Sequence, residues 1–157
     1  MSDVRSRNDR CGTPIDIDVS GIDIQRVRSH RKLKVWQRAA DNAENVFRLT
    51  AGFPRSELFG LTSQMRRSAV SVVSNIAEGA ARSSDREFYR FLDIAMGSAG
   101  ELQAQLDVAD RLHFGDPALR SAAIEEVDEV KRMTASLMRA VQARIRNRVS
   151  RNLRSDI

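Results

Sequence analysis

Apolar and polar residues follow one another with helical spacing along most of the chain after Leu33. The apolar positions recur at intervals of three and four residues, which places them on one face of an α-helix. Short segments containing glycine and proline divide the pattern into four stretches. We therefore expect four amphipathic helices. Their predicted apolar faces comprise Val35, Ala39, Ala43, Val46 and Thr50; Leu58, Leu61, Met65, Ala69, Val72 and Ile76; Phe88, Phe91, Ala95, Ala99, Leu102, Leu106 and Ala109; and Leu119, Val127, Val130, Leu137, Val141 and Ile145.

Glycine and proline mark the expected helix ends. The first helix should end near Gly52, and Pro54 is suited to start the second because its φ is already helical. Gly79 can adopt the left-handed backbone that stops a helix, and Gly115 is expected to close the third helix. Pro117 then opens the fourth helix.

The third helix is expected over residues 85–112, with a serine as its N-cap. Ser83 and Ser84 are both candidates, because a serine hydroxyl can accept a hydrogen bond from an otherwise unpaired amide. Glu87 lies three residues beyond Ser84, as in a capping box. His113, near the helix end, is suited to interact with the C-terminal end of the helix dipole.

Four helices with short connections and one apolar stripe each predict an all-α fold, an up-down-up-down antiparallel four-helix bundle. We expect the bundle over residues 32–148, with flexible basic termini. Residues 1–31 lack helical periodicity and are predicted to be a disordered extension. Within them, Ile15–Ile24 alternates like a strand but has no second strand to pair with, so it could instead bind along a groove. Residues 149–157 form the predicted basic tail.

Composition bounds the location and the chemistry. No apolar run approaches the roughly 18 residues of a membrane span, and no apolar segment follows the arginines of the amino terminus as in a secretory signal. We expect a soluble cytoplasmic protein. The single cysteine, Cys11, excludes an internal disulfide and argues against a metal cluster. The two histidines, His30 and His113, have no nucleophile or glutamate at a catalytic spacing, so we expect no enzyme, no cofactor and no metal.

The formal net charge of +5 is concentrated at the carboxyl end, where residues 139–157 carry six arginines and one acid. Such a segment favours contact with phosphates or an acidic protein surface, although a solubilising tail has the same composition. A second row, Arg82, Arg86 and Arg90, recurs every fourth residue opposite the core stripe. The predicted nucleic-acid-binding residues are Arg66, Arg67, Arg82, Arg86, Arg90, Arg139, Arg144, Arg146, Arg148, Arg151 and Arg154.

Polar residues also form a stripe beside the apolar stripe on the second and third helices, at about 100° per residue. This stripe could contact a ligand or RNA, but a helix or subunit interface that fixes the register is the favoured interpretation. Gly97 and Gly100 would permit a close backbone approach there. The residues of the predicted interface are Gln64, Ser68, Ser71, Asn75 and Glu78 on the second helix and Ser98, Glu101 and Gln105 on the third.

Several short motifs together resemble the bacterial 23S rRNA-intervening sequence proteins. They include Trp36-Gln37, Phe59-Gly60-Leu61, "SNIAEG" from Ser74, Glu87-Phe88 and Gly97-Ser98, within a resemblance that covers about Leu33 to Phe114. The resemblance implies a left-handed four-helix bundle that assembles as a ring-like homopentamer without established enzymatic activity. Related bundles are accessory proteins of diversity-generating retroelements, where they are thought to bind RNA and a reverse transcriptase.

Two functions follow as hypotheses. The first is a non-catalytic homo-oligomer that binds nucleic acid, RNA rather than DNA, through its arginines. The second is a protein-interaction scaffold, or an accessory subunit that docks a partner such as a reverse transcriptase.

Overall fold

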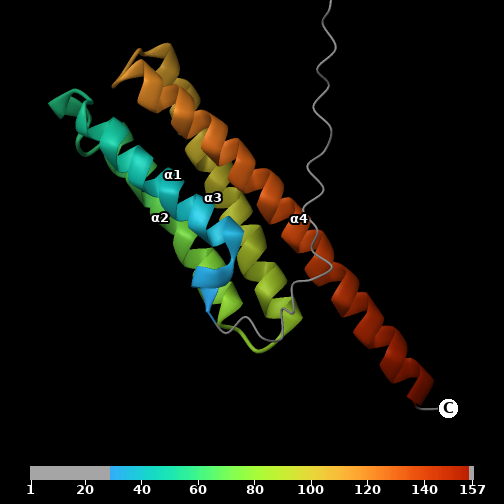
Figure 1. Ribbon diagram of the computed structural model, residues 1–157. Coiled ribbons are helices and arrows are strands. Elements are labelled where there is room, and N and C mark those ends of the chain that lie inside the picture. The colour runs from blue at the N-terminus through green and yellow to red at the C-terminus, as the bar shows by residue number, and fades with distance from the viewer. Residues whose placement is uncertain (1–28, 156–157) are drawn as a thin grey trace, which may run out of the picture.

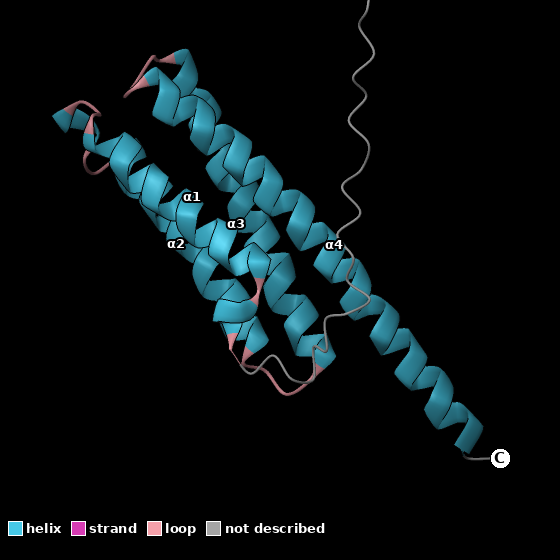
Figure 2. Cartoon of the chain, viewed as in Figure 1, coloured by secondary structure: helices cyan, strands magenta, loops and turns pink. Residues whose placement is uncertain are grey.

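The protein is an antiparallel bundle of four helices in the computed structural model, which describes residues 29–155 (Figure 1). No strand is present over this range (Figure 2). The predicted all-α four-helix bundle is thus confirmed. The elements are the short 3-10 turns η1 (His30–Lys32) and η2 (Arg55–Glu57) and the helices α1 (Lys34–Ala51), α2 (Leu61–Ala80), α3 (Asp85–Arg111) and α4 (Pro117–Ser155).

The structure tests the expectations for the two termini only in part, because it does not describe all of their residues. Residues 1–28, including the segment Ile15–Ile24, and residues 156–157 lie outside the described part. At the other end, α4 continues through Ser155, so most of the predicted tail of residues 149–157 is helical.

The core forms along the apolar faces of all four helices. Its largest fully buried side chains include Leu49 from α1, Met65 and Ile76 from α2, and Leu92 and Leu102 from α3. Residues buried at spacings of three and four bring each helix against its neighbours, as the sequence pattern predicts. The valines Val127, Val130 and Val141 complete the core from α4.

The start of α2 differs from the expectation. Pro54 begins the turn η2 instead of the helix, because its ψ of 140° is extended. Gly60, at φ −100° and ψ −118°, separates this turn from Leu61, the first residue of α2. Leu58 therefore lies outside the helix and is 51% exposed, although the pattern placed it on the apolar face.

The predicted left-handed stop at Gly79 is wrong. Gly79 lies inside α2, and Ala81 closes the helix with right-handed dihedrals. The glycine instead allows α3 to come close. A Cβ at this position would lie 2.8 Å from Phe91 Cβ and 2.9 Å from Phe88 Cδ2.

The N-cap of α3 is Ser84. Its hydroxyl accepts a hydrogen bond from the backbone N–H of Glu87 at 3.2 Å and donates one to Glu87 Oε2 at 2.9 Å. These two bonds satisfy an otherwise unpaired amide at the helix start and orient the glutamate beside it. Of the two predicted N-cap candidates, Ser83 and Ser84, the structure selects Ser84.

The end of α3 depends on His113, and Gly115 has a different role from the one predicted. His113 has a φ of +54°, the Phe114 N–H donates to Ala109 O at 3.0 Å, and the His113 N–H donates to Asp110 O at 3.1 Å. This is the Schellman arrangement that ends many helices. Gly115, with φ +71°, packs against α1, where a Cβ would come within 2.6 Å of a Leu49 methyl group.

Arg120 holds this connection together from the first turns of α4. The side chain is buried, and its Nε donates to Asp110 Oδ1 at 2.7 Å. Its Nη1 donates to the carbonyl oxygens of Phe114 and Gly115 at 2.7 and 3.2 Å. A buried guanidinium with all these partners closes the corner between α3 and α4.

The helices differ in length, and this positions the candidate site. α3 has 27 residues and α4 has 39. At 1.5 Å per residue, α4 is therefore about 18 Å longer than α3. α3 ends and α4 begins at the same connection, and the two helices are antiparallel. The extra length of α4 therefore extends beyond the start of α3 (Figure 1).

Candidate nucleic-acid interface

The last turns of α4 leave the bundle and form a basic rod, which we call the α4 projection (residues 146–155). Ile145 is the last residue that packs against the core, and residues 146–152 are exposed. The exposed arginines of the projection are Arg146, Arg148 and Arg151. No acidic residue occurs between positions 139 and 155. The projection therefore presents positive charge without local neutralisation along its own helix.

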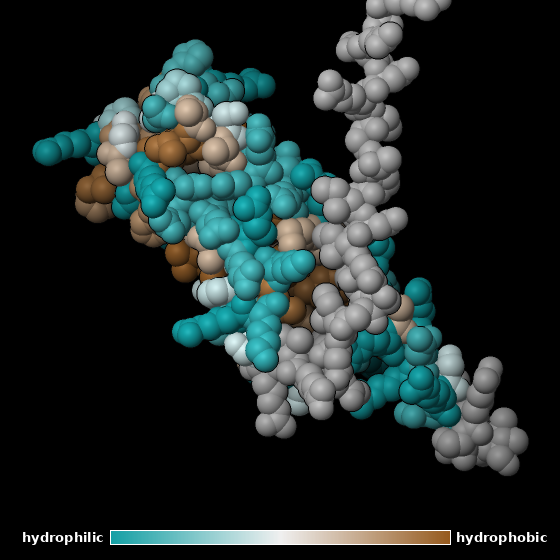
Figure 3. Space-filling model, in the orientation of Figure 1, coloured by the Kyte–Doolittle hydropathy of each residue, from teal (hydrophilic) through white to brown (hydrophobic). Residues whose placement is uncertain are grey.

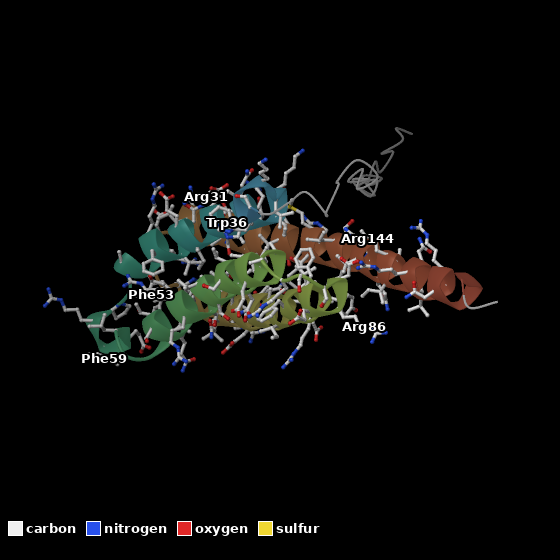
Figure 4. The ribbon with its side chains drawn as sticks, turned by 90° about the horizontal axis from the view of Figure 1, so that it is seen from below. Arg31, Trp36, Phe53, Phe59, Arg86 and Arg144 are labelled. Carbon is white, nitrogen blue, oxygen red and sulfur yellow. The ribbon has the colours of Figure 1, made fainter. Side chains whose placement is uncertain are left out.

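A hollow of about 220 Å³, which we call the junction hollow, lies where the projection leaves the bundle. Arg86 contributes from α3, and Arg148 contributes from α4. Figure 4 shows Arg86 and Arg144 at this end of the molecule. The complete lining consists of Ser84, Asp85, Arg86, Ile145, Arg148, Val149 and Asn152.

One ion pair anchors the base of the projection. Arg144 Nη2 lies 3.1 Å from Asp85 Oδ1, and the Asp85 side chain is only 13% exposed. Within residues 29–155 no ion pair joins Arg86 or Arg148 to an acid. Of the arginines at this end, Arg144 therefore has a structural partner, whereas Arg86 and Arg148 have no acidic partner in the described part of the chain.

The predicted row Arg82, Arg86 and Arg90 is not one helical row. Arg82 precedes α3, and its guanidinium pairs with Glu78 of α2 and lies 4.8 Å from the centroid of the Phe91 ring. Only Arg86 and Arg90 lie on α3, and both are exposed.

The other predicted arginines are scattered over the bundle. Arg66 donates to Thr50 Oγ1 at 2.9 Å and lies 4.8 Å from the Phe47 ring centroid, so it connects α2 to α1. Arg67 is exposed on α2 and Arg139 is exposed on α4. Arg154 belongs to α4, and its side chain lies outside the described part.

The predicted polar stripes of α2 and α3 meet where the two helices pack. Ser71 Oγ lies 2.8 Å from Ser98 Oγ across the helix pair, and Asn75 Nδ2 donates to Ser71 O at 2.8 Å. Ser68 and Gln105 are buried within the chain. We call this set, together with Gln64, Glu78 and Glu101, the polar seam.

The outer edge of the polar seam faces solvent. Gln64 and Glu101 are exposed, and with Arg67, Ser68 and Ser71 they line an open hollow of about 380 Å³. Glu78 is also exposed and is engaged by Arg82. The seam therefore combines contacts within the chain with polar groups that are available to a neighbour.

Gly97 and Gly100 do not bring helices of the same chain together, which was one of the two predicted roles. A Cβ at either position would have no atom within 4 Å, because the two residues lie on the outer side of α3. The close approach of α2 and α3 occurs instead at Gly79.

Sequence reasoning missed a polar network between α1 and α4. Asn42 Nδ2 donates to Ala123 O at 3.0 Å, and Arg38 Nε donates to Glu129 Oε2 at 3.0 Å. The hydrogen bond to the Glu129 carboxylate raises the pKa of the Arg38 guanidinium. Asn42 lies between Ala39 and Val46 on the buried side of α1, so a polar residue on the apolar stripe was the available signal.

The described residues offer no metal site or membrane span. No group of three or more histidine, cysteine, aspartate or glutamate side chains could hold a metal ion among them. No helix in this part of the chain is long and apolar enough to cross a membrane. In Figure 3 the visible face is mainly hydrophilic, with separate hydrophobic patches between the polar side chains.

The fold and these surfaces define an all-α helical-bundle protein with a basic projection on its last helix. The chain belongs to the 23S rRNA-intervening sequence protein family, whose model matches residues 31–136. The match ends before the α4 projection and begins after the residues that precede the bundle.

A solved structure supports the fold. It is the 1.70 Å crystal structure of a protein of unknown function from the S23 ribosomal protein family of Bacteroides thetaiotaomicron VPI-5482. The two proteins are 21% identical with a TM-score of 0.61, over 66% of this chain and 97% of that chain. No curated protein sequence matches the chain.

Proposed function

We propose that this protein is a non-catalytic homo-oligomer that binds nucleic acid, RNA in preference to DNA, through the α4 projection. The observation that carries the proposal is an exposed helical projection that presents Arg146, Arg148 and Arg151, with no acid between residues 139 and 155. Arginines on such a rod can neutralise phosphates and release their counterions, which favours sequence-tolerant binding. The helical spacing places Arg144, Arg148 and Arg151 on one side of α4.

Assembly would multiply this charge. A homopentamer repeats the +5 of one chain around a ring, so each copy adds its own projection to the field that attracts a polyanion. The near-neutral bundle would hold the projections in place, and the projections would make the phosphate contacts.

The test is a titration of a structured RNA stem-loop by fluorescence anisotropy over a series of salt concentrations. The triple variant Arg146→Gln, Arg148→Gln, Arg151→Gln should bind more weakly. The slope of log affinity against log salt should fall by about 2, since each lost phosphate contact removes about 0.7 to 0.9 from the slope.

The matched control removes the same charge elsewhere. Arg55, Arg111 and Arg132 are exposed residues outside the projection, and their triple glutamine variant should keep most of the slope. If both variants lost the same amount of slope, the effect would depend on net charge alone, and this would contradict a binding site on α4. Undetectable binding by the unmodified protein at low salt would contradict nucleic-acid binding altogether.

The alternative function is a scaffold or accessory subunit that docks a protein such as a reverse transcriptase. The specific observation in its favour is the connection between α1 and α2, where Phe59 is 92% exposed and Leu58 is 51% exposed. Adjacent exposed apolar side chains of this size favour a protein contact. The variant Phe59→Ser should abolish capture of such a partner while leaving RNA affinity unchanged, and the opposite result would favour the first function.

A further inference from the structure

The junction hollow combines two kinds of side chain. Ile145 and Val149 contribute apolar surface, and Val149 is 45% exposed. Arg86 and Arg148 contribute positive charge without an acidic partner among residues 29–155. An occupant that fits this hollow would carry apolar side chains together with negative charge.

One segment of this chain has that composition. Ile15–Ile24 reads IDIDVSGIDI, in which isoleucine or valine alternates with aspartate from Ile15 to Val19 and again from Ile22 to Ile24. Residues 11–25 contain three aspartates and no lysine or arginine. In an extended conformation, Ile15 and Ile17 would lie on one face while Asp16 and Asp18 lie on the other. The segment therefore complements both the apolar and the basic parts of the hollow.

The first described residues, which follow this segment in the chain, lie at the end of the bundle that holds the junction hollow. η1 contacts α1 and α2, and the ring centroids of His30 and Trp36, near the start of α1, lie 4.6 Å apart. In Figure 1 the start of α1 lies at the same end as the start of α3, beyond which α4 projects. The chain thus enters the bundle at the end that holds the junction hollow.

The pairing of α1 with α4 allows the span to be estimated. Arg38 pairs with Glu129 and Asn42 contacts Glu126, so antiparallel α1 and α4 place His30 level with about Leu137. Ile145 lies about 12 Å further along the axis, and one sideways step between packed helices adds 8 to 10 Å. The direct distance is therefore about 16 Å. The five residues from Ile24 to Ser29 can span about 17 Å when extended.

We propose that the segment Ile15–Ile24 docks into the junction hollow of its own chain. Ile15 and Ile17 pack on Ile145 and Val149. Its aspartates lie beside Arg86 and Arg148, which are long enough to reach them. The docked segment covers arginines that a polyanion would otherwise contact, and this regulatory consequence, unlike the docking itself, rests on the proposed function.

The single cysteine provides a direct test in the full chain. Cys11 lies four residues before Ile15, and a nitroxide attached to it will broaden the amide resonances of the residues that it approaches. In ¹⁵N-labelled protein we expect broadening at residues 84–86 and 145–152. We expect none at residues 122–132, the acidic part of α4. Absent or evenly distributed broadening would overturn the proposal.

Matched variants separate docking from general charge effects. Asp16→Asn with Asp18→Asn should weaken the broadening, whereas Asp107→Asn with Glu125→Gln changes the net charge equally at exposed positions of the bundle and should leave it unchanged. Equal effects of the two pairs would contradict docking. A second sample mixes protein that carries the nitroxide but no ¹⁵N with ¹⁵N-enriched protein that carries no nitroxide. This mixture should show no broadening, and strong broadening in it would overturn docking within one chain.

The regulatory consequence has a separate readout. If the segment covers the arginines, the Asp16→Asn, Asp18→Asn variant should bind the RNA stem-loop several-fold more tightly than the Asp107→Asn, Glu125→Gln control at low salt. Equal affinities would overturn the regulatory consequence. Absence of RNA binding by every variant would contradict the proposed function, while the relaxation experiment would still report docking.

Discussion

A glycine in this bundle can be required because its missing side chain leaves room for a neighbouring helix, and not only because of its backbone conformation. Gly79 is the second-last residue of α2 and has right-handed dihedrals, a position where alanine would ordinarily be preferred. It is required because the Cβ of Phe91 occupies the space that an alanine methyl group would need. Gly97 lies in the middle of α3, and an added Cβ there would have no atom within 4 Å.

These two glycines give opposite predictions for the same substitution. Gly79→Ala should lower the free energy of unfolding by about 1 to 3 kcal/mol, because the new methyl group overpacks the contact between α2 and α3. Gly97→Ala should raise it by about 0.5 to 1 kcal/mol through its helix propensity. Urea denaturation followed by circular dichroism measures both, and a stabilising Gly79→Ala would contradict the packing that we describe.

The residue scale is also where sequence reasoning was weakest. Glycine at a helix end suggests a left-handed stop, yet Gly79 is helical and the left-handed residue that ends α3 is His113. The sequence cannot distinguish a glycine needed for its backbone from one needed for its missing side chain. That distinction depends on which residues of another helix lie opposite.

Each helix boundary is an element-scale feature that depends on a few hydrogen bonds. The start of α3 was predictable because the capping signal is local: Ser84 and Glu87 are only three residues apart. The start of α2 was not predictable from Pro54, because the extended ψ of the proline and the intervening Gly60 separate it from the helix.

The two serines before α3 allow the cap to be tested. Ser84→Ala should lower the free energy of unfolding by about 1 kcal/mol, since the Glu87 amide loses its acceptor at the helix start. Ser83→Ala is the control, because this exposed neighbour is not the N-cap. Thermal and urea denaturation should rank the variants in this order, and a larger loss for Ser83→Ala would contradict the assignment.

The whole molecule could be predicted to the level of its fold because the apolar pattern extends over all four helices. The polar seam illustrates what the pattern leaves open. Helical spacing placed Ser71 and Ser98 on stripes of two helices, and the structure brings them within 2.8 Å. The spacing could not distinguish their contact within the chain from a contact with a second copy, because both bury the same polar groups.

Assembly can be tested at two residues of this seam. Asn75→Leu and Glu101→Leu should each disturb the predicted pentamer more than the fold, because they replace polar groups that we expect a neighbouring subunit to contact. Light scattering should report a smaller mass while circular dichroism remains helical. Glu125→Leu, on α4, is the control, and an intact oligomer in both seam variants would contradict the prediction.

Because α4 is longer than the bundle, the residues that stabilise the fold are separate from those available for recognition. Substitutions beyond Ile145 remove little core packing, so they carry a small penalty in folding free energy. The arginines there can therefore be exchanged, added or removed while the bundle stays intact. A library randomised only over residues 146–152 should consequently retain its thermal midpoint in most members and differ mainly in what those members recognise.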